Sequence, residues 1–420
     1  MSVPPDYRPR LADQEICRRL EGSGAVLVEG PKACGKTQTA RQVAASEVLL
    51  DVDERARAAA ALDPGLILAG ATPRLIDEWQ VEPRIWNHVR RAVDDRREPG
   101  QFILAGSAVP AEDASRHSGA GRISRLRMRP MWLFESGMSD GSISLRDLMA
   151  EGKASSTNTV ELAELAEAVA RGGWPALQEM SIEVAMAMVA DYLEEVSRTD
   201  INRVDGARRD PARVRRLLRS LARNVATHVA TTTLAADTAE SGGEPLKRQT
   251  VAEYLTALER LFVIEDQSPW EPHLRSRSIL RKSPKRHFVD PSLAAAALGA
   301  SPRSLLRDLN LFGFLFESLV VRDLRIYSQP MRGEVRQLRD NKGLEIDAVV
   351  ESAAGWAAFE VKLGGPDAID EAAAGLLKLT REIDARRSGE PAALGVIVAG
   401  GYGYTREDGV QVIPITALGP

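Results

Sequence analysis

A glycine-bounded loop near the N-terminus combines a lysine and a threonine at a spacing that is typical of triphosphate binding. It follows the apolar run 25–28 and precedes a helix-forming segment, 37–45. A loop at such a junction directs several backbone N–H groups and the positive end of the helix at one point, where phosphates bind. We predict that Lys36 reaches the β- and γ-phosphates of ATP and that the Thr37 hydroxyl ligates Mg²⁺; the alternative is a glycine turn with a surface lysine. The predicted nucleotide-binding residues are Gly30, Pro31, Lys32, Ala33, Cys34, Gly35, Lys36 and Thr37.

A second apolar segment, 75–78, ends in two adjacent acids, Asp77 and Glu78. Acids at the end of a strand that accompanies a phosphate loop are used by P-loop enzymes to hold Mg²⁺ and to position water. We predict that Asp77 holds Mg²⁺ directly or through water, and that Glu78 orients and deprotonates the attacking water. The alternative is an ordinary strand end with solvated acids.

A third apolar segment, 101–106, ends in Ser107, which we predict to sense the γ-phosphate or to position the water; a helix cap is the alternative. An arginine cluster without acids follows, with Arg122, Arg125 and Arg127. One of them, with Arg122 the first choice, is a candidate arginine finger that stabilises the transition state at a neighbouring subunit's nucleotide. This hypothesis requires a homo-oligomer, whereas a basic surface or a nucleic-acid contact does not.

Three segments near the C-terminus place acids and a lysine in one region: an apolar helix at 311–324 and strands at 343–350 and 356–362. Alternate residues of a strand share a face, and a hairpin between these strands would bring Asp347 close to Glu360. Carboxylates that hold Mg²⁺ beside a lysine that positions water are what metal-dependent phosphodiester cleavage requires. The alternative is a hairpin with a solvated charged face. The candidates are Glu317, Asp347 and Glu360 as metal ligands, with Lys362, and Glu345 shares a face with Asp347.

Hydrophobic periodicity divides the 420 residues into three domains. Residues 1–145 alternate strands and helices and predict a parallel α/β core, residues 146–300 are mainly helical, and residues 301–420 are again α/β. In the middle domain a helix, a strand, a basic turn and a second strand follow one another, which is the outline of a winged helix. The basic segment from Arg275 to Arg286 would then contact the phosphate backbone of DNA without reading its sequence, although many winged helices bind protein instead.

Composition excludes some classes of protein. Charged residues make up 27% of the chain and the formal net charge is −4, so the protein is not a uniformly basic nucleic-acid binder. No apolar run approaches the roughly 20 residues of a membrane helix, and the first residues lack the features of a signal peptide. The two cysteines, Cys17 and Cys34, form no disulfide framework. We therefore expect a cytoplasmic protein with no membrane partner.

Together these motifs resemble the bacterial and archaeal AAA-type P-loop ATPases that carry a C-terminal region of unknown function, and the resemblance covers nearly the whole chain. It implies an AAA-like core, a winged-helix-like middle region, and a tail similar to the PD-(D/E)XK nuclease, or restriction-endonuclease, fold. Within that tail Glu317, Asp347, Glu360 and Lys362 match the nuclease pattern. The motifs that carry the resemblance are the loop 30–37, Leu75-Ile76-Asp77-Glu78-Trp79-Gln80, Leu104-Ala105-Gly106-Ser107, Gly172-Gly173-Trp174-Pro175, Val289-Asp290-Pro291, Phe316-Glu317, Glu345-Ile346-Asp347 and Phe359-Glu360-Val361-Lys362.

The motifs and the resemblance predict two alternative functions. The first is ATP hydrolysis with Mg²⁺, coupled to a C-terminal nuclease-like domain that acts on or binds DNA. The alternative is a nucleotide-switched protein-binding module with little turnover and a catalytically silent tail, because such folds are often retained as binding modules.

Overall fold

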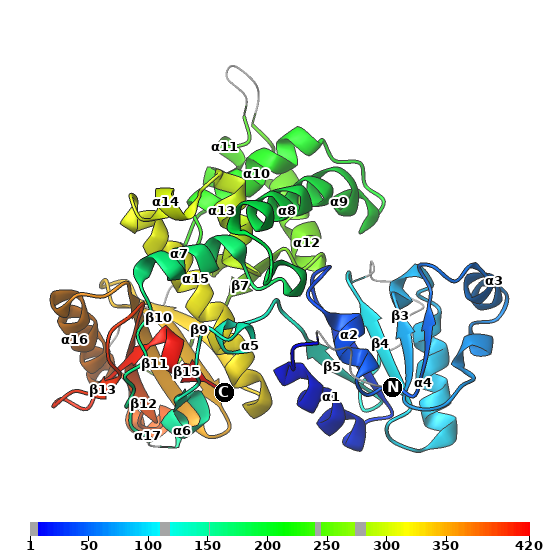
Figure 1. Ribbon diagram of the computed structural model, residues 1–420, viewed down its shortest axis with the longest axis horizontal. Helices are drawn as coiled ribbons and strands as arrows, with labels where there is room; N and C mark the ends of the chain where they lie inside the picture. The colour runs from blue at the N-terminus through cyan, green and yellow to red at the C-terminus, as the bar shows by residue number, and fades with distance from the viewer. Residues whose placement is uncertain (1–6, 110–117, 151, 240–244, 274–282) are drawn as a thin grey trace.

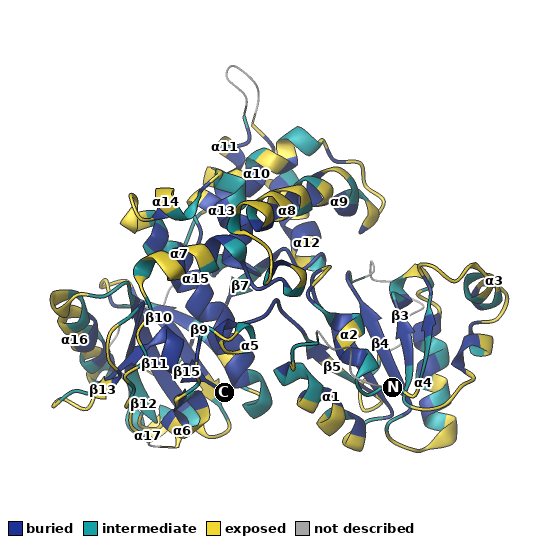
Figure 2. Cartoon of the chain, in the orientation of Figure 1, coloured by how far each residue is buried: buried dark blue, intermediate teal, exposed yellow. Residues whose placement is uncertain are grey.

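The computed structural model describes residues 7–109, 118–150, 152–239, 245–273 and 283–420, which fold into three lobes (Figure 1). An N-terminal α/β lobe and a C-terminal α/β lobe lie side by side, and a helical lobe lies across them (Figure 1). The central strands of both sheets are buried, whereas exposed residues are concentrated on the outer helices and loops (Figure 2). Each sheet is therefore the centre of its own lobe.

The N-terminal lobe is built on a five-stranded parallel sheet with the order β2-β3-β4-β1-β5. Alternate residues of β1 point to opposite faces, so that Ala25 and Leu27 pack on one side and Val26 and Val28 on the other. Both faces need helical cover, which explains the continuous apolar run. The parallel α/β core predicted from the sequence is confirmed. Its elements are α1 (Leu11–Gly22), β1 (Ala25–Glu29), α2 (Lys36–Arg41), β2 (Ser46–Leu49), α3 (Glu54–Leu62), β3 (Arg74–Asp77), α4 (Ile85–Arg96), β4 (Phe102–Gly106) and β5 (Ile123–Arg127).

The helical lobe shows how capping and periodicity define its helices. At the start of α10, Asp210 accepts a hydrogen bond from the N–H of Ala212, and Pro211 occupies the first position, where no N–H is needed. The buried residues of α10 recur every three or four positions and face the interior. The helices are α7 (Leu162–Arg171), α8 (Ile182–Glu195), α9 (Ile201–Arg203), α10 (Pro211–Arg223), α11 (Thr231–Ala236), α12 (Arg248–Arg260), α13 (Pro291–Leu298) and α14 (Pro302–Leu305).

Helices α10, α11 and α12 are followed by an antiparallel hairpin of β7 (Ile264–Gln267) and β8 (Lys285–Phe288), which is the element order of a winged helix. The described part of this hairpin lies against the C-terminal lobe. Pro269 bridges to Gln337 of β9, and the Gln267 amide donates to the carbonyl oxygens of Arg336 and Asp347. The winged helix stays a prediction, and the hairpin is shared between two lobes.

The C-terminal lobe contains a six-stranded mixed sheet with the order β13-β14-β12-β11-β10-β9. Alternate residues of β11 belong to two clusters, because Ala357 and Phe359 pack on the side of α15 and Trp356 and Ala358 on the side of α16. Both faces of the sheet are thus covered by a helix. The elements are α15 (Leu309–Ser328), β9 (Glu334–Arg339), β10 (Glu345–Ser352), β11 (Gly355–Lys362), α16 (Pro366–Glu382), α17 (Ala385–Ser388), β12 (Ala393–Val398), β13 (Tyr404–Thr405) and β14 (Gln411–Pro414).

A segment between the first two lobes is built into the C-terminal lobe. The short strand β6 (Ile143–Ser144) pairs in parallel with β15 (Leu418–Gly419), between α5 (Leu133–Ser136) and α6 (Leu145–Met149). Nearby, the backbone N–H of Ala154 donates to the side chain of Gln411 at 2.8 Å. Residues 143–144, which the sequence placed at the end of the N-terminal domain, therefore cover the C-terminal lobe, since Ile143 is buried there.

The three lobes meet at the half-buried carboxylate of Glu265 on β7. Arg129, which follows β5, donates to both of its oxygens at 2.6 and 3.0 Å. Arg325 of α15 lies 3.3 Å away and Arg127 lies 3.9 Å away. Burial alone would raise the pKa of Glu265, but Arg127, Arg129 and Arg325 hold that pKa well below its usual range.

We expect Glu265→Gln to destabilise the protein by about 3–5 kcal/mol, because it leaves several guanidinium groups with no carboxylate at a buried site. The measurement is the thermal midpoint of unfolding. The matched control is Glu334→Gln on β9, whose side chain is 68% exposed and pairs with Arg336, and we expect it to change stability by less than about 0.5 kcal/mol. Equal shifts in the two variants would contradict a structural role for the junction.

Candidate functional site

The phosphate loop lies between β1 and α2, at the carboxyl edge of the parallel sheet. Ala33 and Gly35 adopt left-handed backbone conformations, with φ values of 59° and 103°. A Cβ atom on Gly30 would lie 2.0 Å from a neighbouring backbone carbonyl oxygen, so only glycine fits that position. The side chain of Lys36 is buried, and its Nζ donates a hydrogen bond to the carbonyl of Pro31 at 2.7 Å. The ammonium group therefore lies against the loop itself.

The two predicted Mg²⁺ ligands of this lobe are in contact. Thr37 Oγ1 hydrogen-bonds to the Asp77 carboxylate, at 2.9 and 3.1 Å from its two oxygens. Burial raises the pKa of Asp77 to about 6; Glu78 and Asp51 add to the rise, whereas Thr37 and Lys36 oppose it. A hydroxyl and a carboxylate side by side beside a phosphate loop fit Mg²⁺, which is held in such sites by one or two protein oxygens and by phosphate.

Glu78 and Ser107 lie together at the ends of β3 and β4. Ser107 Oγ donates to Glu78 Oε2 at 3.1 Å, and the amide of Gln80 contacts both side chains. Glu78 has a left-handed backbone with φ of 50°, a conformation that is uncommon outside glycine and that is concentrated at functional sites. Gln80 was assigned no role from the sequence, although its place in the Asp-Glu-x-Gln motif was a usable signal. The structure brings the predicted water-handling residues to one point.

A cavity of about 850 Å³ adjoins the phosphate loop. The guanidinium of Arg10 fixes the loop beside it, because Nη1 donates to the carbonyl of Cys34 at 2.8 Å and Nη2 to the carbonyl of Arg129 at 2.9 Å. Arg10 was not predicted from the sequence, since a single arginine near the N-terminus forms no motif. The Gly-Gly-Trp-Pro motif also contributes to the cavity. Its lining includes Tyr7, Arg10, Gly35, Thr39, Met131 and Pro175.

The nucleotide side of the N-terminal lobe contacts the helical lobe at two points. Lys32 of the phosphate loop pairs with Asp200 at 2.6 Å, and Asp200 ends the π-helical turn Val196–Asp200 that follows α8. Two residues beyond Ser107, the backbone of Val109 exchanges hydrogen bonds of 3.0 Å with Arg260, the last residue of α12. Both the phosphate loop and the segment after β4 are therefore tied to helices of the next lobe.

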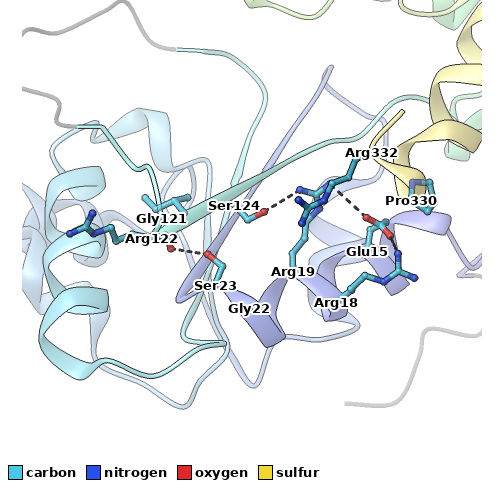
Figure 3. A pocket seen from close by; sticks show the side chains of 11 residues that line it. Glu15, Arg18, Arg19, Gly22, Ser23, Gly121, Arg122, Ser124, Pro330 and Arg332 are labelled. Carbon is cyan, nitrogen blue, oxygen red and sulfur yellow. Dashed lines mark hydrogen bonds and ion pairs between the residues drawn. The ribbon is translucent and has the colours of Figure 1, made fainter. Parts of the chain in front are cut away.

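Arg122 lies at the edge of the sheet opposite the phosphate loop. Ile123 is in register with Ala25 at the start of β1, whereas the loop follows the other end of that strand. The Arg122 side chain pairs with Asp94 at 2.8 Å and borders a groove of about 460 Å³ that also includes Arg332 (Figure 3). This position is remote from the phosphate loop of the same chain, and the role of Arg122 as a finger toward a neighbouring subunit stays a prediction.

The predicted acids of the C-terminal lobe gather beside a cavity of about 510 Å³ lined by α15, β10 and β11. Antiparallel pairing of β10 with β11 places Asp347 near Glu360. Lys362 Nζ lies 2.9 Å from Glu360 Oε2 and 3.8 Å from Asp347 Oδ2. Burial raises the pKa of Glu317 and of Glu360 to about 8, and the charge of Asp347 adds to both shifts.

Lys285 also enters this cluster, although the sequence did not predict it. The Lys285 side chain is 2% exposed, and its Nζ lies 2.8 Å from Glu317, 3.1 Å from Glu345 and 3.3 Å from Asp347. Burial alone would raise the pKa of Asp347, but Lys285 and Lys362 hold it below its usual value. Across the part of the chain that the structure describes, no group of three or more His, Cys, Asp or Glu side chains is arranged to hold a metal ion.

The basic segment predicted to contact DNA, Arg275 to Arg286, lies largely outside the described residues, because 274–282 are not described. The prediction is wrong for Lys285, which is buried among carboxylates. Arg286 is half-buried and is engaged by Asp266 at 3.5 Å and by the carbonyl of Val229. Both side chains are thus occupied by protein groups.

The fold and the site define the N-terminal lobe as a P-loop nucleoside triphosphatase, because a parallel sheet carries a phosphate loop after β1 and acids after β3. Residues 22–136 match the model of a family described as an AAA domain, which is consistent with this fold and site. Residues 162–304 match a domain of unknown function (DUF8612), and residues 312–418 match another (DUF4143). No curated protein matches the chain.

Among solved structures, the chain is similar to a Walker-type ATPase of Pyrococcus abyssi, with 14% identity and a TM-score of 0.43 over 70% of this chain and 96% of that one. AMPPCP-bound DnaA from Aquifex aeolicus is 13% identical, with a TM-score of 0.29 over 62% of this chain and 89% of DnaA. Similarities of this size carry no argument about function, so we infer the function from the residues of the site. None of the described helices is both long enough and apolar enough to cross a bilayer.

Proposed function

We propose that the N-terminal lobe binds ATP with Mg²⁺ at the phosphate loop and hydrolyses it. The observation that carries this proposal is the meeting of two pairs of side chains at one edge of the sheet. Thr37 contacts Asp77 at 2.9 Å, and Ser107 contacts Glu78 at 3.1 Å, both beside the loop. The first pair is suited to a cation on the phosphates and the second to the attacking water.

Each residue has a separate role in this proposal. The backbone N–H groups of the loop and the Lys36 ammonium bind the β- and γ-phosphates. Thr37 and Asp77 hold Mg²⁺, which neutralises phosphate charge when it is bound. Glu78 orients and deprotonates the water, whose oxygen forms a bond to the γ-phosphorus as the bond to the leaving oxygen of ADP breaks. Ser107 fixes the Glu78 carboxylate.

The cavity beside Gly35 is the proposed place for the base and ribose. It adjoins the loop on the side of α2 and combines the aromatic ring of Tyr7 with Pro175 and Met131. Such apolar walls with a few polar groups are typical of small-molecule sites. Because Pro175 comes from the helical lobe, a bound nucleotide would contact two lobes at once.

We further propose that the nucleotide state is passed to the C-terminal lobe, which acts on or binds DNA. The ties of Lys32 to Asp200 and of Val109 to Arg260 reach the helical lobe, and the β7–β8 hairpin that follows α12 contacts the C-terminal lobe, which supports such coupling. A second candidate function is a nucleotide-switched protein-binding module whose C-terminal lobe cuts nothing. The burial of Lys285 among the acids favours this second candidate, since it occupies the carboxylates that cleavage would need.

The deciding experiment is steady-state ATP hydrolysis with Mg²⁺, measured with and without double-stranded DNA. Turnover that requires Mg²⁺ supports the ATPase assignment, and its absence at millimolar ATP contradicts it. Stimulation by DNA supports the DNA-linked form of the proposal. Turnover that ignores DNA, together with intact DNA after long incubation, supports the protein-directed switch.

A further inference from the structure

Lys285 joins two parts of the chain that match different families. It begins β8, within the segment 162–304, whereas the carboxylates that it contacts lie within 312–418. The strand β8 pairs with β7, and Lys285 lies opposite Gln267. The amide of Gln267 in turn donates to the carbonyl of Asp347 at 2.9 Å. The hairpin that carries Lys285 is thus held, through Gln267, against the strand that carries Asp347.

The ammonium group of Lys285 is fully used by this cluster. It has three N–H donors, and three carboxylate oxygens lie within 2.8 to 3.3 Å, on Glu317, Glu345 and Asp347. Burying an ammonium is tolerated only when it is paired and hydrogen-bonded in this way. Burial alone would lower the pKa of Lys285, but the charges of Glu317, Asp347 and Glu345 raise it.

The carboxylate oxygens are correspondingly occupied. Asp347 Oδ1 faces Lys285, and Asp347 Oδ2 accepts a hydrogen bond from the backbone N–H of Val361 at 2.9 Å. Glu360 is held by Lys362 at 2.9 Å. A divalent cation needs several free oxygens around one point, and an ammonium group already present there opposes a second positive charge. The residues present therefore do not fit a metal ion in this arrangement.

We infer that Lys285 is a built-in cation of the C-terminal lobe: its ammonium group takes the place of a divalent ion among Glu317, Glu345 and Asp347 and closes the cluster to metal. The lysine that closes the cluster is carried by β8, a strand that belongs to the middle of the chain. Metal-dependent cleavage is consequently switched off while β8 occupies its position. This inference concerns the C-terminal lobe alone and holds whether or not the N-terminal lobe hydrolyses ATP.

The test is the number of Mn²⁺ ions bound per nucleotide-free chain, counted by electron paramagnetic resonance. In the wild type and in Asp347→Asn we expect the same number, because Asp347 holds no metal. In Lys285→Met, which keeps the length of the side chain and removes its charge, we expect one additional Mn²⁺. Adding Asp347→Asn to Lys285→Met should remove that ion again. Any Mn²⁺ held by the N-terminal lobe is common to all these proteins and does not affect the differences in bound Mn²⁺ between them.

The matched control is Lys342→Met, which removes an exposed lysine from the turn between β9 and β10 and should bind no additional ion. Mn²⁺ in the wild type that is lost in Asp347→Asn would overturn the inference, as would a folded Lys285→Met with no additional ion. If Lys285→Met does not fold, the comparison of the wild type with Asp347→Asn decides alone: equal binding supports the closed cluster, and unequal binding overturns it.

Discussion

Replacing Lys36 by alanine is expected to reduce ATP turnover at least about a hundredfold, the usual loss when a preorganised charge-stabilising donor is removed. The ammonium group lies inside the phosphate loop, 2.7 Å from the carbonyl of Pro31. A bound triphosphate offers that group phosphate oxygens, which carry full negative charge, in place of a neutral carbonyl. Alanine removes this charge at the point where negative charge accumulates in the transition state. The measurement is the rate of phosphate release, together with binding of a fluorescent ATP analogue.

The control for this variant is Lys378→Ala, which removes an exposed lysine of α16 in the C-terminal lobe and should leave turnover unchanged. Equal melting temperatures of the two variants would show that the loss of turnover in Lys36→Ala is not due to unfolding. Turnover that survives in Lys36→Ala would show that the phosphate loop is not part of the catalytic site. It would also contradict the ATPase assignment of this lobe.

Glu78→Gln is expected to bind ATP as tightly as the wild type and to hydrolyse it about 10²- to 10⁴-fold more slowly, the range typical of a lost general base. Glutamine keeps the size of the side chain and can still meet Ser107 Oγ, which lies 3.1 Å from the carboxylate. It cannot accept the proton of the attacking water. Single-turnover hydrolysis and equilibrium binding separate the chemical step from affinity.

Glu98→Gln serves as the matched control, because Glu98 is exposed beyond the end of α4 and should have no effect. A Glu78→Gln protein that loses ATP binding and turnover to the same extent would assign Glu78 to nucleotide binding. A protein that keeps full turnover would mean that another group orients the water.

The N-terminal site was predictable because its signals are local. Lys36, Asp77 and Ser107 each follow an apolar strand, and the carboxyl ends of parallel strands lie at one edge of a sheet. The order of strand ends along the chain thus predicts that these residues meet in space. Asp347 and Glu360 were placed together for a similar reason, since they lie on neighbouring strands of one hairpin.

Lys285 was not predictable from the same kind of signal. It stands in a run of basic residues that is typical of an exposed loop, and Glu317 and Asp347 lie 32 and 62 residues further along the chain. No periodicity relates a lysine to acids at such separations. Only the packing of the β7–β8 hairpin on the C-terminal lobe determines the contact. Arg10 and its bonds to the phosphate loop escaped prediction for the same reason.

The pairing of β6 with β15 has a consequence for how the chain folds during its synthesis. The N-terminal lobe is complete in sequence once β5 has been made and can fold while translation continues. The segment around Ile143 cannot reach its place at that stage, because its partner strand, Leu418–Gly419, is translated last among the described strands. Ile143 and its apolar neighbours therefore remain exposed while the helical lobe and most of the C-terminal lobe are synthesised. A nascent chain that stalls before residue 418 would present this uncovered segment to chaperones or to other nascent chains.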